Sequence, residues 1–368
     1  MLPLLLLGLA LSMLPPDLRA QSPPRAELRG TVIDAESGLP LVGAHVFIAG
    51  SMAGTVTDRQ GRYMLSGLPA GAHRLYVSML GYQPDFRDIL IRSVQVLTFD
   101  FELSEVVLDA GEIVVEAERD DKWLSRLERF TRAFIGETPN AQQTTIVNPE
   151  VLDFEEHRGT FRATAQAPII IENLALGYRI QYFLSDFAIT PTRVQYDGEP
   201  LFEQMQTDNP EQARLWDENR RVAFMGSFRH FALALLAGRV EAQGFKTWSR
   251  PTAGGQGIQG DTRFPLDPAS LITPGDSPGE YHLHFEGAVE IAFMGEMEHP
   301  EYLSQGNPGA RDGRRRPSFQ TSWLTMEDGP TVMDYKGDIL NPYGITFRGY
   351  LAWQRVADEV PREYRPGS

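Results

Sequence analysis

The chain contains no cysteine, although it is 368 residues long. It can therefore form no disulfide bond, and it offers no thiol nucleophile and no thiolate ligand for zinc or an iron–sulfur cluster. Lipid attachment to an N-terminal cysteine is excluded for the same reason. Because 42% of the residues are hydrophobic, we expect the apolar core to stabilise the fold without cross-links.

Basic residues are scarce relative to acidic ones. Lysine and arginine total 34 against 49 aspartate and glutamate, so the formal net charge is -15. Such a chain repels phosphate backbones, and we expect no nucleic-acid partner. The one basic cluster, residues 311–316, lies between Gly309 and Pro317. This setting predicts a solvated loop, with a patch for an anionic ligand as the alternative.

Long apolar runs are scarce too. The first 14 residues form such a run, which ends at Pro15-Pro16 and is shorter than the ~20 residues of a membrane-spanning helix. With small residues up to Ala20, it predicts a signal peptide at 1–20 that is cleaved before Gln21. An uncleaved interfacial segment is the alternative. We expect an exported protein, periplasmic or associated with the outer membrane, with no transmembrane segment after cleavage.

Residues 21–26 have the composition of a linker, and short alternating segments follow it. About seven such segments, separated by glycine- and proline-containing turns, predict a seven-stranded Greek-key β-sandwich over residues 27–105. The predicted strands are 28–33, 44–48, 55–57, 62–65, 74–79, 88–91 and 96–103.

This stretch contains five motifs of turn and strand residues: Gly30-Thr-Val-Ile-Asp34, Gly38-Leu-Pro-Leu-Val-Gly-Ala-His-Val46, Gly54-Thr-Val-Thr-Asp58-Arg-Gln-Gly61-Arg-Tyr63, Leu68-Pro-Ala-Gly71 and Val77-Ser-Met-Leu-Gly81-Tyr82. We interpret Asp58 as a turn residue that accepts backbone N–H groups before Gly61, and not as a catalytic acid. Together the motifs resemble a known family, the carboxypeptidase regulatory-like domain, a transthyretin (prealbumin)-like sandwich found at the N-terminus of TonB-dependent receptors.

Residues 106–120 are expected to form a linker strand, and residues 108–117 resemble the segment that joins the same sandwich to the plug of those receptors. For residues 121–368 the pattern predicts a strand-rich α+β domain. Three helices are expected, from Asp121 to about Gly136, from Pro210, and from Ser227 to Gly238. The arrangement is similar to that of envelope proteins with the same sandwich, which implies an architecture and no activity. The matching segments are 123–136, 148–150, 171–178, 226–230 and 356–364.

No catalytic, cofactor-binding or metal-binding residue is predicted. No histidine is followed by glutamate three residues later, so the zinc carboxypeptidase motif is absent. The best metal candidate is His282-Leu-His284-Phe-Glu286, which a strand would place on one face, although an ordinary half-buried strand gives the same pattern. Ser277 fits Gly-x-Ser-x-Gly, but the flanking prolines favour a loop.

We therefore predict a non-catalytic binding or scaffold protein of the cell envelope, with a protein or glycan ligand and no cofactor. Two alternatives remain open. A carbohydrate-binding protein, suggested by the resemblance of the sandwich to starch-binding-like domains, would need an exposed aromatic platform. A hydrolase would use His230, His282 or His284. The candidate platform residues are Tyr76, Tyr82, Trp248 and Trp323.

Overall fold

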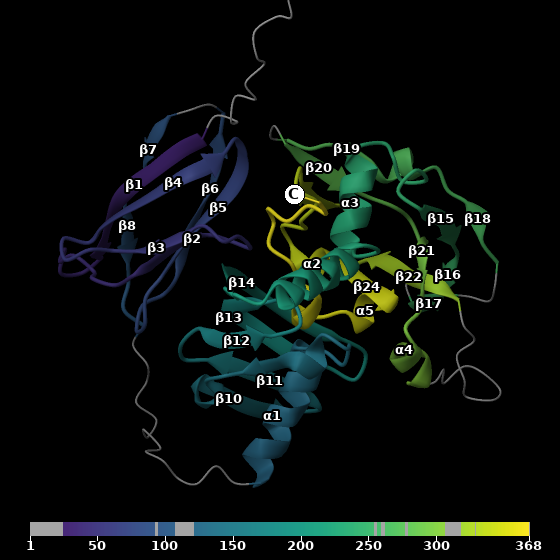
Figure 1. Ribbon diagram of the computed structural model, residues 1–368, viewed down its shortest axis with the longest axis horizontal. Helices are drawn as coiled ribbons and strands as arrows, with labels where there is room; N and C mark the ends of the chain where they lie inside the picture. Colours follow the sequence, from purple (N-terminus) through teal and green to yellow (C-terminus); the bar gives the residue numbers. More distant parts are fainter. Residues whose placement is uncertain are drawn as a thin grey trace, which may run out of the picture.

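The computed structural model describes residues 25–92, 95–106, 121–253, 256–258, 262–276, 279–305, 318–327 and 329–367. The predicted signal peptide, residues 107–120 of the predicted linker strand, Ser277 and the basic cluster at 311–316 lie outside the described residues. Within those ranges, no helix is both long enough and apolar enough to cross a membrane. Figure 1 shows a sandwich beside a larger, strand-rich domain, as the sequence predicted for the fold class.

The N-terminal sandwich consists of two sheets packed face to face. One sheet has the order β4-β1-β7, with β8 also paired to β1, and the other has the order β3-β2-β5-β6. Alternate residues such as Leu28, Val46 and Val77 are fully buried between the sheets. The stretch predicted as one strand at 96–103 is divided into β7 and β8. The strands are β1 (Arg25–Asp34), β2 (His45–Ile48), β3 (Gly54–Val56), β4 (Arg62–Pro69), β5 (Gly71–Ser78), β6 (Asp85–Ile91), β7 (Val96–Thr98) and β8 (Phe101–Leu103).

The turn between β3 and β4 has the predicted structure. The carboxylate of Asp58 accepts hydrogen bonds from the backbone N–H groups of Gln60, at 2.8 Å, and Arg62, at 2.9 Å. Gly61 has a φ of 69°, which glycine adopts without strain. Asp58 therefore stabilises the turn.

The first half of the C-terminal domain is a six-stranded sheet, β10-β11-β13-β12-β9, with β14 on the other edge of β13. Helix α1 buries Phe130 and Phe134 against this sheet, where both rings contact Phe187. The elements are α1 (Asp121–Phe134), β9 (Thr144–Ile146), β10 (Leu152–His157), β11 (Thr160–Ala165), β12 (Ile169–Asn173), β13 (Tyr178–Ile189) and β14 (Val194–Gln204), with 3-10 turns at Ala141–Gln143 and Pro149–Val151.

Helices α2 (Pro210–Phe224) and α3 (Phe228–Leu236) lead into the second half, a five-stranded sheet ordered β18-β15-β21-β22-β24. As predicted, Ser227 caps α3 by accepting the N–H of His230. The remaining elements are β15 (Phe245–Arg250), β16 (Thr252–Ala253), β17 (Gln256–Ile258), β18 (Phe264–Pro265), β19 (Ile272–Pro274), β20 (Glu280–Leu283), β21 (Ala288–Met297), α4 (Pro300–Ser304), β22 (Phe319–Met326), β23 (Thr331–Asp334), β24 (Ile345–Gly349) and α5 (Tyr350–Trp353), with 3-10 turns at Pro268–Leu271, Pro342–Gly344 and Val356–Asp358.

The apolar pattern of residues 344–352 predicts one continuous strand, and this prediction is wrong at its C-terminal end, because β24 ends at Gly349. Gly349 has a φ of 77°, and the chain turns there into helix α5. The positive φ ends the extended conformation that the apolar pattern suggested.

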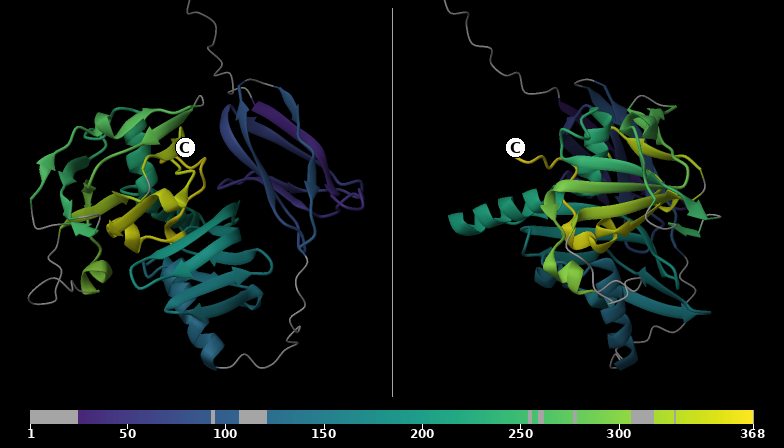
Figure 2. Two further views of the ribbon diagram at one scale, coloured as in Figure 1. Left: turned by 180° about the vertical axis from the view of Figure 1, so that it is seen from behind. Right: turned by 90° about the vertical axis from the view of Figure 1, so that its right-hand side faces the viewer.

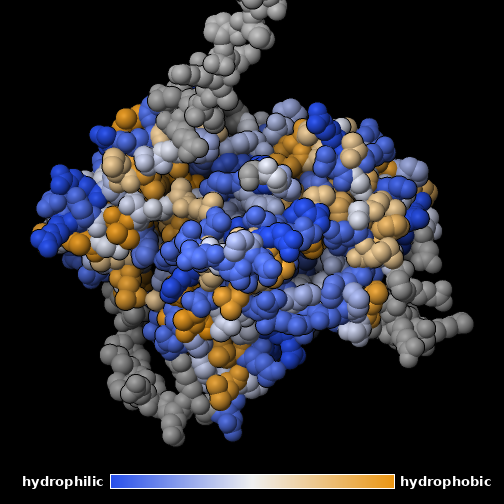
Figure 3. Space-filling view, in the orientation of Figure 1, coloured by the Kyte–Doolittle hydropathy of each residue, from blue (hydrophilic) through white to orange (hydrophobic). Residues whose placement is uncertain are grey.

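The last described residues lie between the sandwich and both sheets of the larger domain (Figure 2). Ala357 donates its N–H to the carbonyl of Ile135, at 3.2 Å, and its own carbonyl accepts from the side chain of Asn173, at 2.9 Å. The surface in the view of Figure 3 is mainly hydrophilic with scattered hydrophobic residues. The C-terminal segment, 355–365, is thus an internal element that contacts several parts of the fold.

Candidate functional site at the domain junction

Backbone hydrogen bonds connect the sandwich to the larger domain. Gly50 donates its N–H to the carbonyl of Pro200, at 2.8 Å, and Ser51 accepts from the N–H of Phe202, at 2.9 Å. The carbonyl of Gly50 accepts from the N–H of Arg362, also at 2.9 Å. The loop after β2 therefore pairs with the edge strand β14, as one strand pairs with another.

An aromatic cluster forms the apolar part of this junction. Phe47 of β2 and Tyr76 of β5 project from the outer face of the sandwich, and Phe183 of β13 packs between them. The ring centroids of Phe47 and Phe183 lie 4.7 Å apart. Tyr76 is only 6% exposed, so it is buried at the junction and cannot belong to an exposed sugar platform.

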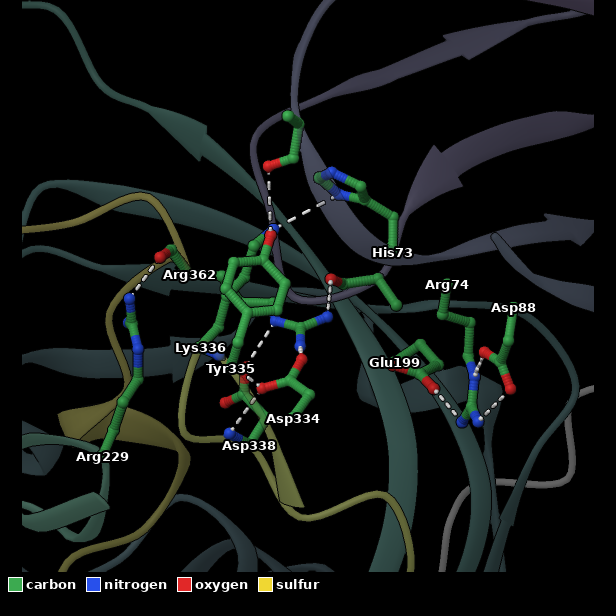
Figure 4. Close-up of polar contacts among 12 residues, drawn as sticks. His73, Arg74, Asp88, Glu199, Arg229, Asp334, Tyr335, Lys336, Asp338 and Arg362 are labelled. Atoms are coloured by element: carbon green, nitrogen blue, oxygen red, sulfur yellow. Dashed lines mark hydrogen bonds and ion pairs between the residues drawn. The ribbon is translucent and has the colours of Figure 1, made fainter. Parts of the chain in front are cut away.

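A buried ion-pair network lies beside the aromatic cluster. The guanidinium of Arg362 pairs with the carboxylates of Asp334 and Asp338 (Figure 4). Burial raises the pKa of Asp334, and the charge of Asp338 raises it further, while Arg362 opposes both. Burial works against the charge of Arg362, but the two aspartates raise its pKa overall. The positive guanidinium of Arg362 and the negative carboxylates of Asp334 and Asp338 compensate one another, which offsets the cost of burying these charges.

His73 of β5 contacts the larger domain through a second polar pair. Its Nδ1 lies 3.2 Å from Nζ of Lys336, and its Nε2 lies 2.9 Å from the carbonyl of Pro69. Burial, with the charge of Lys336, lowers the pKa of His73 to about 4. Burial also lowers the pKa of Lys336 to about 8. The neutral imidazole therefore accepts a hydrogen bond from the ammonium group and donates one to Pro69.

Arg74 forms the third polar contact across the junction. It pairs with Asp88 within the sandwich, at 2.9 Å, and with Glu199 of β14, at 3.2 Å (Figure 4). Burial raises the pKa of Glu199, and Arg74 opposes that rise. One guanidinium thus bridges the two domains.

A cavity of about 450 Å³, the junction cavity, lies where the sandwich and both halves of the larger domain meet. The sandwich contributes Gly50 and Arg74 to its lining, and the first sheet contributes Tyr182 and Glu199. Helix α3, the loop after β23 and the C-terminal segment complete it, with Arg229, Asp338, Asp358, Glu359 and Arg362 among the lining residues.

Glu359 is the group in this cavity whose charge is least compensated. Its carboxylate accepts no hydrogen bond from any of the described residues. Burial raises its pKa to about 7, and the charges of Asp338 and Asp358 add to the rise. Its neighbour Asp358 has a pKa raised to about 6 by burial, but accepts hydrogen bonds from Asn140, at 2.9 Å, and Thr138, at 3.1 Å. Glu359 is therefore the carboxyl group available to a ligand.

Arg229 positions the C-terminal segment along the cavity wall. Its guanidinium donates to the carbonyls of Pro361, at 2.7 Å, and Val360, at 3.3 Å, as well as to Arg362. Burial lowers its pKa to about 10, so it stays charged near neutral pH. Its Nε–H has no acceptor among the described residues. Arg229 therefore has a structural role, and its Nε–H is an unused hydrogen-bond donor.

The candidate metal site does not assemble as the sequence suggested. Strand β20 ends at Leu283, so His284 and Glu286 are outside the strand that would have aligned them with His282. His282 lies 3.8 Å from the carboxylate of the exposed Asp276. Among the described residues, no group of three histidine or acidic side chains is arranged to hold a metal ion.

His230, the histidine of the hydrolase hypothesis, is a core residue. Its Nδ1 accepts the N–H of Gly226, at 3.1 Å, and its Nε2 lies 3.1 Å from the amide oxygen of Gln243. Burial lowers its pKa. Both ring nitrogens are thus occupied by structural partners.

Two of the four proposed platform residues do lie together. Glu290 of β21 is paired in register with Trp248 of β15 on one side and with Trp323 of β22 on the other. The three side chains line a groove of about 450 Å³. The guanidinium of Arg263 lies 4.3 Å from the ring centre of Trp248, and the indole N–H of Trp323 donates to Glu290 at 3.1 Å. The fourth, Tyr82, donates instead to Glu105 at the end of the sandwich.

Sequence reasoning did not identify the junction residues. Glu359 and Arg362 lie in a segment that the sequence marked only as part of a resemblance. Their partners are distant in the chain, so no spacing pattern connects them. Phe47, an aromatic residue at an outward position between two inward ones, is the signal that could have indicated a covered face.

Comparison with known proteins identifies the sandwich. Residues 28–115 match the CarboxypepD_reg-like domain family. A 100-residue stretch is 38% identical to the TonB-dependent receptor P39 of Formosa agariphila. That match covers 26% of this chain and 9% of the receptor.

Solved structures give only a partial likeness. The 3-chlorocatechol 1,2-dioxygenase of Rhodococcus opacus 1CP is 14% identical, with a TM-score of 0.20, over 25% of this chain and 64% of that one. The catechol 1,2-dioxygenase of Acinetobacter sp. ADP1 is 17% identical, with a TM-score of 0.21, over 27% of this chain and 59% of that one. Scores this low say nothing about function. The chain thus carries a CarboxypepD_reg-like domain at residues 28–115, followed by a strand-rich α+β domain.

Proposed function

We propose that this protein is a non-catalytic binding protein of the cell envelope, in which the sandwich forms one wall of a ligand site. The observation that carries the proposal is the junction cavity, because all three parts of the fold contribute to its lining. Its volume of about 450 Å³ lies within the range of small-molecule sites.

The polarity of the junction cavity favours binding over structure alone. Asp358 and Arg229 form hydrogen bonds with neighbouring protein groups, whereas the carboxyl group of Glu359 is uncompensated. A ligand that donates a hydrogen bond or carries a positive charge would satisfy it. A protein side chain or a glycan hydroxyl meets this requirement.

An envelope location is supported by two features. A 100-residue stretch of the chain is 38% identical to a TonB-dependent receptor, and residues 1–14 form an apolar run typical of export. We propose a periplasmic or outer-membrane-associated protein on these grounds.

The proposal is tested by thermal unfolding of the full chain in the presence of a panel of sugars, amino acids and short peptides. A Leu340→Trp variant is the control, because Leu340 lines the junction cavity and belongs to none of the core clusters. We expect at least one compound to raise the Tm of the wild type and not that of the variant. Compounds that stabilise both proteins equally, or none at all, would refute a ligand site in the cavity.

Carbohydrate binding is a second candidate, and the row Trp248, Glu290 and Trp323 favours it. Sugar rings pack on aromatic side chains, and the carboxylate of Glu290 lies between the two indoles. Affinity electrophoresis through gels with neutral polysaccharides tests it. If the polysaccharide retards the wild type and the Trp323→Ala substitution abolishes that retardation, carbohydrate binding is supported. Equal mobility of both proteins would reject it.

A further inference from the structure

A second, larger depression, the arginine cleft, lies in the C-terminal domain. Its volume is about 870 Å³, and it is bounded by α1, the β13–β14 turn, β24 and α5. Five arginines and one glutamate line it. The net positive lining is unusual in a chain whose formal charge is -15. The arginines are Arg129, Arg132, Arg193, Arg348 and Arg355.

Two of these arginines keep their charge uncompensated. Arg129, Arg132 and Arg193 each form a surface ion pair with a glutamate. Arg348 and Arg355 form no ion pair with any carboxylate in the part of the chain that the structure describes. Two guanidinium groups that have no carboxylate partner are suited to carboxylate recognition, because a guanidinium group can donate two parallel hydrogen bonds to one carboxylate.

Aromatic and neutral polar groups line the spaces between the arginines. Tyr343 and Trp353 line the cleft, and Thr190 and Gln195 add a hydroxyl and an amide. The indole N–H of Trp353 is buried and has no hydrogen-bond partner among the described residues. Such groups match a ligand with apolar ring faces and hydroxyls.

We propose that the arginine cleft binds a carboxylated oligosaccharide. Arg348 and Arg355 bind the carboxylates, the ring of Tyr343 packs against a sugar face, and the hydroxyl and amide groups bind sugar hydroxyls. A single inorganic anion would occupy a small part of 870 Å³. An acidic peptide would leave the aromatic faces and neutral polar groups unused.

This site is distinct from the junction cavity, although the two share a wall. Tyr196 and Arg355 line both. Burial raises the pKa of Tyr196 to about 12, while the hydrogen bond from Arg355 opposes that rise. Occupation of the cleft does not require a ligand in the cavity, so each proposal can fail without the other.

Calorimetric titration of the full chain with trigalacturonate and trimannuronate near neutral pH tests the proposal. We expect binding that weakens as salt is raised from ~50 to ~200 mM. The methyl ester of trigalacturonate, which has the same sugar without the charge, should bind much more weakly. Arg348→Gln and Arg355→Gln should each weaken binding roughly tenfold.

Matched variants make the outcome specific. Arg214→Gln, an exposed arginine of α2 outside the cleft, should bind like the wild type, as should Leu340→Trp, which fills the junction cavity. Arg348 is exposed, so its variant should fold even if Arg355→Gln does not. The proposal is overturned if neither trisaccharide binds, if binding ignores Arg348→Gln, or if Leu340→Trp abolishes it. Equal affinity for inorganic phosphate or triglutamate would also overturn it.

Discussion

The uncompensated carboxyl group of Glu359 makes a quantitative prediction about stability. Burial raises its pKa from 4.5 to about 7. Between these values the unfolded chain has lost the proton, while the folded chain keeps it. The free energy of unfolding of the wild type should therefore fall as pH rises through this window. The full destabilisation caused by ionising Glu359 in the folded chain is reached above about pH 7. At about 1.4 kcal/mol for each pKa unit, that cost is at most roughly 3.5 kcal/mol.

Glu359→Gln removes this cost, because glutamine stays neutral. The variant and the wild type should differ little in pH dependence below about pH 4.5, and by about pH 8 the variant should be more stable than the wild type by up to ~3.5 kcal/mol. Urea unfolding at several pH values measures the difference. The glutamine side chain can also change stability by an amount that does not depend on pH. This amount cancels, because only the change of the stability difference with pH is compared. Glu363→Gln, at an exposed position four residues further on, is the control and should show no such trend. A pH-independent difference for Glu359→Gln would refute the reasoning.

Two further predictions concern the junction. Arg362→Met leaves Asp334 and Asp338 without their cation, and we expect a loss of about 3–5 kcal/mol in urea unfolding; a loss below about 1 kcal/mol would show that the pair is solvated. Lys336→Met removes a positive charge near His73, so NMR titration should find the pKa of that imidazole raised from about 4 but still below 6.5, because burial is the larger cause. An unchanged pKa would contradict the contact.

Local structure could be predicted from the sequence where the interacting residues are close together in the chain. In the turn at Asp58 and the cap at Ser227, a side-chain oxygen accepts a hydrogen bond from a backbone N–H group two or three residues further along the chain. Donor and acceptor are therefore close in the sequence, and both motifs could be predicted from it. Helix α1 begins at Asp121, as the acidic start and apolar spacing indicated. The fold class follows from these elements.

Predictions failed where the structure is determined by backbone geometry or by contacts between residues that are far apart in the sequence. Apolar alternation continued past Leu283 and past Gly349, but the strands end there. Trp248 and Trp323 are 75 positions apart in the sequence, and only the pairing of both strands with β21 brings them together. The junction cavity needs the sandwich, two sheets and the chain terminus at once, which periodicity does not encode.

The segments that carried the resemblance to other envelope proteins meet in three dimensions. Ile135, Asn173 and Arg229 belong to three of those segments, and each contacts a backbone group of the C-terminal segment. A shared arrangement of motifs that are far apart in sequence therefore corresponds to one structural feature, the C-terminal segment.

This segment also connects the sites. Arg355 lies in the wall between the arginine cleft and the junction cavity, Glu359 faces the cavity, and Arg362 holds the ion pairs that join the sandwich. Spacings of four and three residues separate them, so a shift of the segment would move all three. A substitution at Arg355 should therefore alter both ligand binding and the urea stability of the junction, whereas Arg348→Gln, on the exposed edge of β24, should alter binding alone. Equal effects of the two substitutions on stability would show that the segment does not couple the cleft to the junction.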